Sequence, residues 1–195
     1  MSDSLDSTAT RRRLTDKRAD TVRRLSEAAA EVVRESPYSD LTFQQIATRA
    51  GVTRATAYVY FSSKEHILAE VYRRRLVDAP PPDLAGLPVA DRVAATFRHL
   101  ALLWAENPEF GRAAARALLS DDPDVDAVRI EVNTAIHLLL TRAAGDDAGP
   151  DLVGLLELAY AGAIVRAGTG HMSYSEVADS LTYAAHTVLG GTNAQ

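Results

Sequence analysis

The sequence predicts an all-α fold, in which a small N-terminal head of three helices with a helix-turn-helix precedes a larger helical body. Apolar residues recur at the three- and four-residue spacing of helices through most of the 195-residue chain. No stretch alternates apolar and polar residues between turn signals, as a half-buried strand would. Capping residues and prolines mark many of the expected helix starts. With 47% hydrophobic residues, the chain is long enough to bury a core.

The first helix is expected from Asp16 to Glu35. Its apolar residues fall at helical spacing and would cover the next two helices; they are Val22, Leu25, Ala29, Val32 and Val33. Ser36-Pro37 ends it. Residues 1–14 are expected to form a flexible basic arm that includes Arg11, Arg12 and Arg13. The arm either touches phosphates or a minor groove, or is a solvated leader.

A helix-turn-helix is predicted within residues 42–64. Thr42 and Gln45 form a capping box, so the second helix should begin at Phe43. Gly51 supplies the left-handed residue that ends this helix. Thr53 then caps a third helix, which runs to about Tyr60. The residues expected to hold the pair against the first helix are apolar; they are Ile46, Val52, Ala57 and Tyr60.

The outward face of the third helix has the chemistry of a DNA-reading surface. It consists of Thr53, Arg54, Ala55, Thr56 and Tyr58. Hydroxyl and guanidinium groups suit base edges and phosphates. Thr42 and Lys64 are expected on phosphates, since a lysine at a helix N-terminus opposes the helix dipole unless an anion is bound there. Gln44 and Tyr60 complete the expected DNA-binding set.

Residues 42–68 resemble the DNA-binding domain of the TetR family of bacterial repressors. The run Tyr58-x-Tyr60-Phe61-x-Ser63-Lys64-Glu65 carries most of the resemblance, together with Thr42, Ile46-Ala47, Ala50-Gly51-Val52 and Leu68. The chain departs from the family pattern at Ala57, where a larger apolar residue is common. The resemblance implies a palindromic operator bound by a homodimer and a small-molecule effector bound in the body.

The head and the body are expected to meet after Asp78. A fourth helix, expected from Ser62 or Ser63 with a box between Ser62 and Glu65, would join them. Pro80, Pro81 and Pro82 then interrupt helical structure. This gives a DNA-binding domain over 15–78 and a ligand-binding and dimerisation domain over 79–195.

The body is predicted to contain five helices. Prolines at residues 88, 108, 123 and 150 open the first four, and a Ser173–Glu176 box opens the last. The helix containing residues 134–140 is apolar nearly all round, so we expect it to be covered on every side. With the family resemblance, the residues expected to line an effector cavity beside it are Phe97, Leu100, Trp104, Phe110, His137 and Tyr160. For each of these residues the alternative is plain core packing.

Two apolar stripes in the last two helices predict an association surface. The stripes are Leu152, Leu155, Leu156, Ala159 and Ala163, and Val177, Leu181, Ala184, Ala185 and Val188. Gly154 and Gly162 would allow helices to approach closely. The family resemblance makes these two helices the homodimer interface. The alternative is that both stripes are buried within one subunit.

The charge distribution agrees with a DNA-binding head. Residues 1–78 hold 14 Lys and Arg against 11 Asp and Glu, whereas residues 79–195 hold 7 against 15. The overall net charge of −5 hides this asymmetry.

Other classes of protein are less consistent with the sequence. No apolar run is long enough to span a membrane and no secretory signal is present, so a cytoplasmic protein is expected. There is no cysteine, and the five histidines are dispersed, so no metal site, cofactor or catalytic centre is expected. With the helix-turn-helix, the resemblance to the TetR family therefore implies a ligand-controlled transcriptional repressor. The alternative function is a helical protein–protein adaptor without specific DNA binding.

Overall fold

A computed structural model describes residues 3–145 and 148–190, with side chains from Asp16 onward. Within these ranges the chain forms helices and loops but no strand, which agrees with the predicted all-α class. The helices are α1 (Asp3–Glu35), α2 (Phe43–Arg49), α3 (Arg54–Tyr58), α4 (Lys64–Asp78), α5 (Val89–Leu102), α6 (Pro108–Ala117), α7 (Pro123–Ala144), α8 (Pro150–Gly168) and α9 (Tyr174–Gly190).

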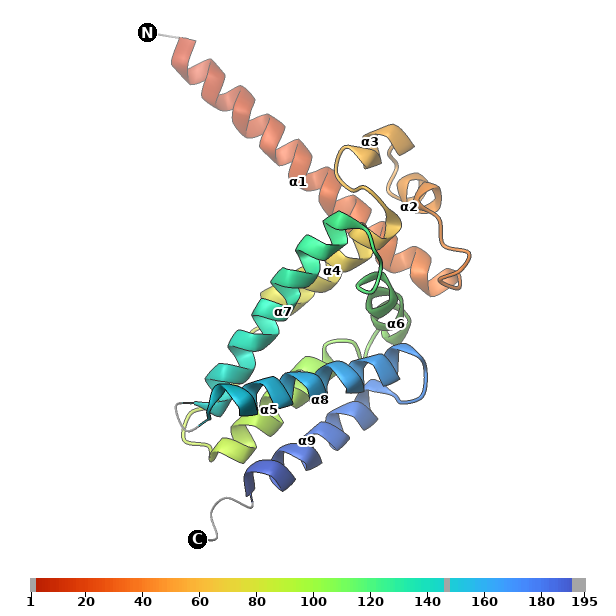
Figure 1. Cartoon of the computed structure of the whole chain (residues 1–195). Coiled ribbons are helices and arrows are strands. Elements are labelled where there is room, and N and C mark those ends of the chain that lie inside the picture. The colour runs from red at the N-terminus through yellow and green to blue at the C-terminus, as the bar shows by residue number, and fades with distance from the viewer. Residues whose placement is uncertain (1–2, 146–147, 191–195) are drawn as a thin grey trace.

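The first helix begins earlier than predicted. The sequence indicated a start near Asp16 after a flexible arm, whereas α1 begins at Asp3. The expected arm is therefore the first part of a long helix that projects from the molecule (Figure 1). The side chains of Arg11, Arg12 and Arg13 lie outside the described part, so their contact with DNA stays a prediction.

Helices α1 to α3 form the head, and α4 links it to the body (Figure 1). Helix α4 packs on α1 in the head and on α6 and α7 in the body. Its buried residues include Leu68 and Leu76, at opposite ends of the helix. One rigid element therefore contacts both the DNA-reading part and the larger domain.

The body contains the five predicted helices. Helix α9 packs along α5, while α8 packs against α6, α7 and α9. Figure 1 shows α8 and α9 side by side at the end of the molecule remote from the head. The largest side chains of the body core are Trp104 and Phe97, which are 1% and 0% exposed.

The helix starts follow the local capping chemistry. Asn107 and Asp122 cap α6 and α7, with proline at the first helical position of each. Ser173 and Glu176 form the predicted box, in which the Glu176 amide donates to the Ser173 hydroxyl at 3.1 Å. Helix α4 differs, because Ser63, rather than Ser62, accepts from the backbone of its first turn at 3.0 Å.

The outer face of α7 differs from the prediction. The apolar run at residues 134–140 suggested cover on every side, yet Leu138 is 62% exposed and His137 lies on the surface. Only one side of α7, with Val132, Ile136 and Leu140, faces the core. Helix α7 therefore presents apolar surface to solvent in the isolated subunit.

Candidate nucleic-acid interface and effector cavity

The start of α2 is fixed by the predicted capping box. The Gln45 amide donates to the Thr42 hydroxyl at 3.2 Å, and the Thr42 amide donates to the Gln45 side chain at 2.7 Å. Phe43 and Ile46 are buried beneath this turn, at 8% and 0% exposure. The reciprocal bonds satisfy amides that an uncapped helix start would leave unpaired.

The turn between α2 and α3 also has the predicted geometry. Gly51 adopts φ 67°, in the left-handed region. The Val52 amide returns to the Ala47 carbonyl at 3.0 Å, and the Arg24 guanidinium donates to the Ala50 carbonyl at 3.1 Å. The long first helix therefore holds the end of α2 in place.

Helix α3 is short and capped by Thr53, whose hydroxyl accepts from the Thr56 amide at 3.0 Å. It ends at Tyr58 rather than near Tyr60 as predicted. The amides of Val59 and Tyr60 bond three residues back, at 3.2 and 3.0 Å, which tightens the chain into a turn. Ala57 is fully buried, so the small residue packs directly against the head core.

The predicted DNA-reading face of α3 is exposed. Thr53, Arg54, Ala55, Thr56 and Tyr58 all lie on the surface. Tyr58 stacks on Phe43 with ring centroids 4.4 Å apart, and its hydroxyl accepts from the Arg54 guanidinium at 3.0 Å. These contacts hold the phenol and the guanidinium together on one surface.

Two other predicted DNA-binding residues occupy different positions. Gln44 is exposed on α2, where its side chain donates to the Thr48 hydroxyl at 3.0 Å. Tyr60 is half-buried and lines a polar cleft between the head and α7. The structure therefore does not bring Tyr60 to the exposed face of α3.

Lys64 is directed into the head rather than toward solvent. Its ammonium donates to the Leu41 carbonyl at 2.8 Å and to the Tyr38 carbonyl at 3.2 Å. It also lies 4.6 Å from the centroid of the Tyr38 ring. Burial and the nearby Glu65 carboxylate raise the pKa of Tyr38 above its usual range. Lys64 thus holds the loop that leads into α2.

A carboxylate joins the head to the body. Asp122, the cap of α7, accepts from the hydroxyls of Ser62 at 3.2 Å and Ser63 at 2.5 Å. Burial acts to raise the pKa of Asp122, but hydrogen bonds, led by that from Ser63, outweigh it and hold the pKa below its usual value. The start of α4 is therefore linked to the loop between α6 and α7.

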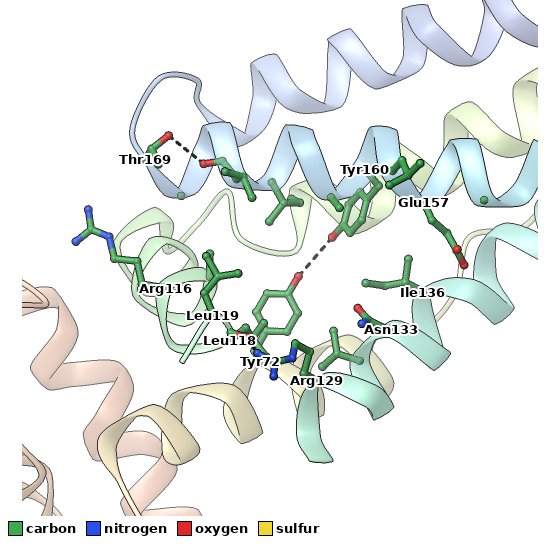
Figure 2. Close-up of a pocket in the computed structure, with 18 residues that line it drawn as sticks. Tyr72, Arg116, Leu118, Leu119, Arg129, Asn133, Ile136, Glu157, Tyr160 and Thr169 are labelled. Carbon is green, nitrogen blue, oxygen red and sulfur yellow. Dashed lines mark hydrogen bonds between the residues drawn. The ribbon is translucent and has the colours of Figure 1, made fainter. Parts of the chain in front are cut away.

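A cavity of about 420 Å³ lies among α4, α6, α7 and α8 (Figure 2). Most of its lining is apolar, as in small-molecule sites generally. Tyr72 and Tyr160 contribute hydroxyls, and the charged lining residues are Arg116, Arg129 and Glu157. The apolar lining residues include Leu118, Leu119, Val132, Ile136, Leu158, Ala161, Ile164 and Val165.

Only one of the predicted effector-binding residues lines this cavity, namely Tyr160. Phe97, Leu100, Trp104 and Phe110 are core residues with at most 2% exposure. The Trp104 ring stacks between Tyr72, at 4.4 Å, and Phe110, at 5.7 Å. His137 lies on the surface and pairs with Glu157 at 2.7 Å.

The predicted association stripes are divided between the core and the surface of the subunit. Leu156, Val177, Leu181 and Ala185 are at most 4% exposed and pack within the subunit, whereas Leu155 and Val188 are 52% and 45% exposed. One face of α8, which includes Leu155 of the predicted stripe, is open. It consists of Leu155, Leu158, Gly162 and Val165, at spacings of three and four residues, and the three larger side chains are 49–73% exposed. Tyr183 of α9 is 75% exposed.

Comparison with known proteins agrees with this geometry. The family model described as bacterial regulatory proteins, tetR family, matches residues 25–71. An HTH-type transcriptional regulator of Mycobacterium tuberculosis is 44% identical over 175 residues, which cover 89% of this chain and 82% of that protein. The chain therefore belongs to the TetR family of bacterial transcriptional regulators. The family consists of transcriptional regulators, in agreement with the expectation that the protein is not an enzyme.

Solved structures show the same fold. A TetR regulator from Rhodococcus sp. RHA1 superposes with a TM-score of 0.71 at 22% identity, covering 91% of this chain and 99% of that one. The TetR regulator TylP from Streptomyces fradiae gives a TM-score of 0.58 at 27% identity, covering 87% and 86%. The match extends through the body as well as the head.

Two further findings concern the described part of the chain. No helix there is both long and apolar enough to cross a membrane. No group of three or more histidine and acidic residues within it has the arrangement of a metal site.

Proposed function

We propose that this protein is a ligand-responsive repressor that binds a palindromic operator as a homodimer and leaves it when a small, largely apolar effector binds the body. The observation that carries the proposal is the exposed face of α3. Its hydroxyl, guanidinium and phenol groups lie on a helix whose start, turn and packing are fixed by the contacts above. Such a surface suits a major groove.

The residues have separate roles in this proposal. Arg54, Thr56 and Tyr58 face the bases, with Thr53 and Ala55 beside them. Thr42 and Gln44 are exposed at the start of α2, where they meet the phosphate backbone. Lys64 has three donors, and two are directed at carbonyl groups. Lys64 therefore supports phosphate binding in two ways. It holds the Tyr38–Leu41 loop in position, and its third donor is available to a phosphate oxygen.

The proposed dimer interface consists of the open face of α8 and the exposed Tyr183 of α9. A single recognition helix reads few bases, whereas two that are ~34 Å apart read both halves of a palindrome. Exposed leucines at helical spacing beside Gly162 suit close packing against a second copy. The family resemblance supports the same two helices.

The effector acts through contacts between the cavity and the head. Leu118 and Leu119, at the end of α6, and Arg129 of α7 line the cavity. The loop between these helices carries Asp122, which holds Ser62 and Ser63 at the start of α4. An effector that binds more tightly to the protein with the loop in one of two positions favours that position. The loop then moves α4, which changes the spacing of the two heads.

The test is a fluorescence-anisotropy titration with DNA from upstream of the protein's own gene, with unrelated DNA as comparison and at several salt concentrations. We expect selective binding that weakens steeply as salt rises, because phosphate contacts release counterions. Arg54→Ala should reduce the preference for the operator by on the order of tenfold. Arg34→Ala is the matched control, since Arg34 is exposed at the far end of α1 and donates to its own helix.

The adaptor function predicts a different result. Without specific DNA binding, neither DNA would bind at low salt, and the proposal would be withdrawn. Equal binding to both DNAs would refute only the choice of operator. A cytoplasmic location belongs to the same proposal, since the operator DNA is there.

A further inference from the structure

Two buried tyrosine hydroxyls meet in the effector cavity. Tyr72 comes from α4 and Tyr160 from α8; each is 3% exposed, and both line the cavity. Figure 2 shows their hydroxyl groups directed toward each other across the space between these helices. The two oxygens are 3.4 Å apart, longer than the usual 2.5–3.0 Å of a bond between two hydroxyls.

This contact leaves one donor unused. Each phenol carries one hydrogen, and a bond between the two uses only one of them. In the part of the chain that the structure describes, no other bond is made by either hydroxyl. Whichever tyrosine donates, the hydrogen of the other has no acceptor.

The adjoining core adds more unused polar groups. The Trp104 indole, stacked on Tyr72, has a buried Nε1–H without a partner among the described residues. The Tyr174 hydroxyl is likewise buried and unpaired there. Burial raises the pKa of Tyr160 well above its usual range, and the hydroxyls of Tyr72 and Tyr174 add to this. The phenols therefore stay protonated and available as donors near neutral pH.

The charged groups of the cavity are paired with other groups or directed away from the two tyrosines. Arg129 is paired with Asp126 at 2.6 Å and also donates to the Leu118 carbonyl at 2.7 Å. Glu157 is paired with His137. Arg116 is exposed, and Figure 2 shows it directed away from the two tyrosines. An anion beside the tyrosines would lose its hydration without gaining a cation, whereas a neutral oxygen would accept the unused hydrogen.

We propose that the cavity binds an uncharged, mostly apolar molecule with a hydrogen-bond-accepting oxygen, such as a ketone, ester or ether, and that the Tyr72–Tyr160 pair donates to this oxygen. This inference rests on the proposed function, because it takes the cavity as the effector site. The apolar part of the molecule lies against Val132, Ile136 and Ile164, and the single polar contact fixes its orientation.

Binding can be measured without DNA. Trp104 is the only tryptophan of the chain and stacks on Tyr72, so its fluorescence reports on this end of the cavity. We would titrate the full-length protein with cyclodecanone, with cyclodecane, which lacks the oxygen, and with decanoate, which is an anion. We expect the ketone to bind roughly tenfold more tightly than the hydrocarbon, and decanoate to bind more weakly than the ketone.

Tyrosine-to-phenylalanine variants identify the donor. The double variant Tyr72→Phe/Tyr160→Phe keeps both rings and should lose the roughly tenfold preference for the ketone while binding cyclodecane as the wild type does. Of the two single variants, the one that loses the preference for the ketone identifies the tyrosine that donates. Thr134→Val removes an exposed hydroxyl of α7 that donates to the Ile130 carbonyl of its own helix and should change neither affinity. Thermal unfolding of each variant checks that the fold is retained.

Several outcomes would overturn the inference. These are equal binding of the ketone and the hydrocarbon, tighter binding of decanoate, a preference that survives in the double variant, or no binding of either neutral probe. Since DNA is absent from these titrations, failure of the proposed DNA binding would be recognised separately, in the operator experiment.

Discussion

The ammonium of Lys64 is positioned by two carbonyl groups and one aromatic ring, all from the loop before α2. A lysine at the start of a helix suggests an anion site from sequence alone, because the free amides and the dipole favour negative charge there. In the structure, backbone carbonyls supply much of that negative potential. The same residue therefore stabilises the head in addition to its proposed contact with DNA.

Replacing Lys64 should consequently affect folding as well as DNA binding. We expect Lys64→Met to lower the free energy of unfolding by about 1–2 kcal/mol, since hydrogen bonds from a charged group are lost in a mostly buried setting. Urea denaturation measures this change. Lys17→Met is the control, because Lys17 lies exposed on α1. A Lys64 variant as stable as the wild type would show that the carbonyl contacts contribute nothing.

His99 should make the stability depend on pH. Burial lowers the pKa of His99 below its ordinary value, and its Nε2 has no partner within the described residues. The unfolded chain therefore binds this proton more readily than the folded one, so stability should fall as pH decreases through the ordinary histidine range near 6.5. Urea denaturation at about pH 7.5 and about pH 5.5 should show a smaller loss in His99→Gln. Equal losses in both proteins would contradict this.

At the scale of helices, Arg92 of α5 holds the end of α7. Its guanidinium donates to the carbonyls of Ala143 at 2.7 Å, Ala144 at 3.1 Å and Leu87 at 3.2 Å. The last carbonyls of a helix lack partners within the helix, and a cation there also favours the dipole. One side chain thereby connects the start of α5 to the end of α7.

Arg92→Met should destabilise the protein by about 1–3 kcal/mol, because several bonds to a charged donor are lost. Arg98 is a matched control on the same helix, since both side chains of its ion pair with Asp179 are exposed. Arg98→Met should change the stability by at most about 0.5 kcal/mol. Thermal or urea unfolding would compare the two, and similar effects would refute the role given to Arg92.

Helix α6 requires a glycine where it meets α9. A Cβ on Gly111 would lie 2.3 Å from the Tyr174 hydroxyl and 2.9 Å from the Trp104 Cβ. Gly111→Ala should therefore cost about 1–3 kcal/mol by overpacking, although alanine favours helices. Gly154→Ala, in the second turn of α8 with nothing within 4 Å of its Cβ, should instead stabilise by about 0.5–1 kcal/mol. Unfolding measurements that gave both variants the same sign would contradict this packing.

At the scale of the whole molecule, sequence patterns predicted the features that depend on residues close together in the chain, such as helix caps. The caps at Thr42, Thr53, Asn107 and Asp122 involve neighbours three or fewer residues away, so spacing alone sufficed. The cavity instead depends on which sides of α4, α6, α7 and α8 meet. Trp104 and Phe110 have helical spacing whether they pack on each other or on a ligand, and the structure shows that they pack on each other and Tyr72.

The association surface shows the same limit. An apolar stripe can be buried inside the subunit or between subunits, and the pattern is identical. Leu156 of the predicted stripe packs on the side of α8 that faces the body, whereas Leu155 of the same stripe lies on the open face. The open face also contains Gly162, which has no side chain and therefore weakens the apolar pattern. Only the packed body shows which side of the helix remains exposed.

The open face of α8 leads to a prediction for the assembled protein. Leu155 is 52% exposed and does not line the cavity, so Leu155→Glu should leave the subunit folded while placing a charge in the proposed interface. Desolvating two such carboxylates at a symmetric contact opposes association. We expect sedimentation velocity to show monomers, and operator affinity to fall on the order of a hundredfold, because two linked heads no longer bind together.

Ile130→Glu gives the matched control, since it introduces the same charge at a residue of α7 that is 59% exposed. This variant should remain dimeric and bind the operator as the wild type does. If Leu155→Glu stayed dimeric while Ile130→Glu became monomeric, the interface would lie on α7, whose exposed Leu138 is the other candidate contact. Because each subunit carries one exposed α3, loss of the dimer should weaken operator binding far more than binding to unrelated DNA, which needs only one head.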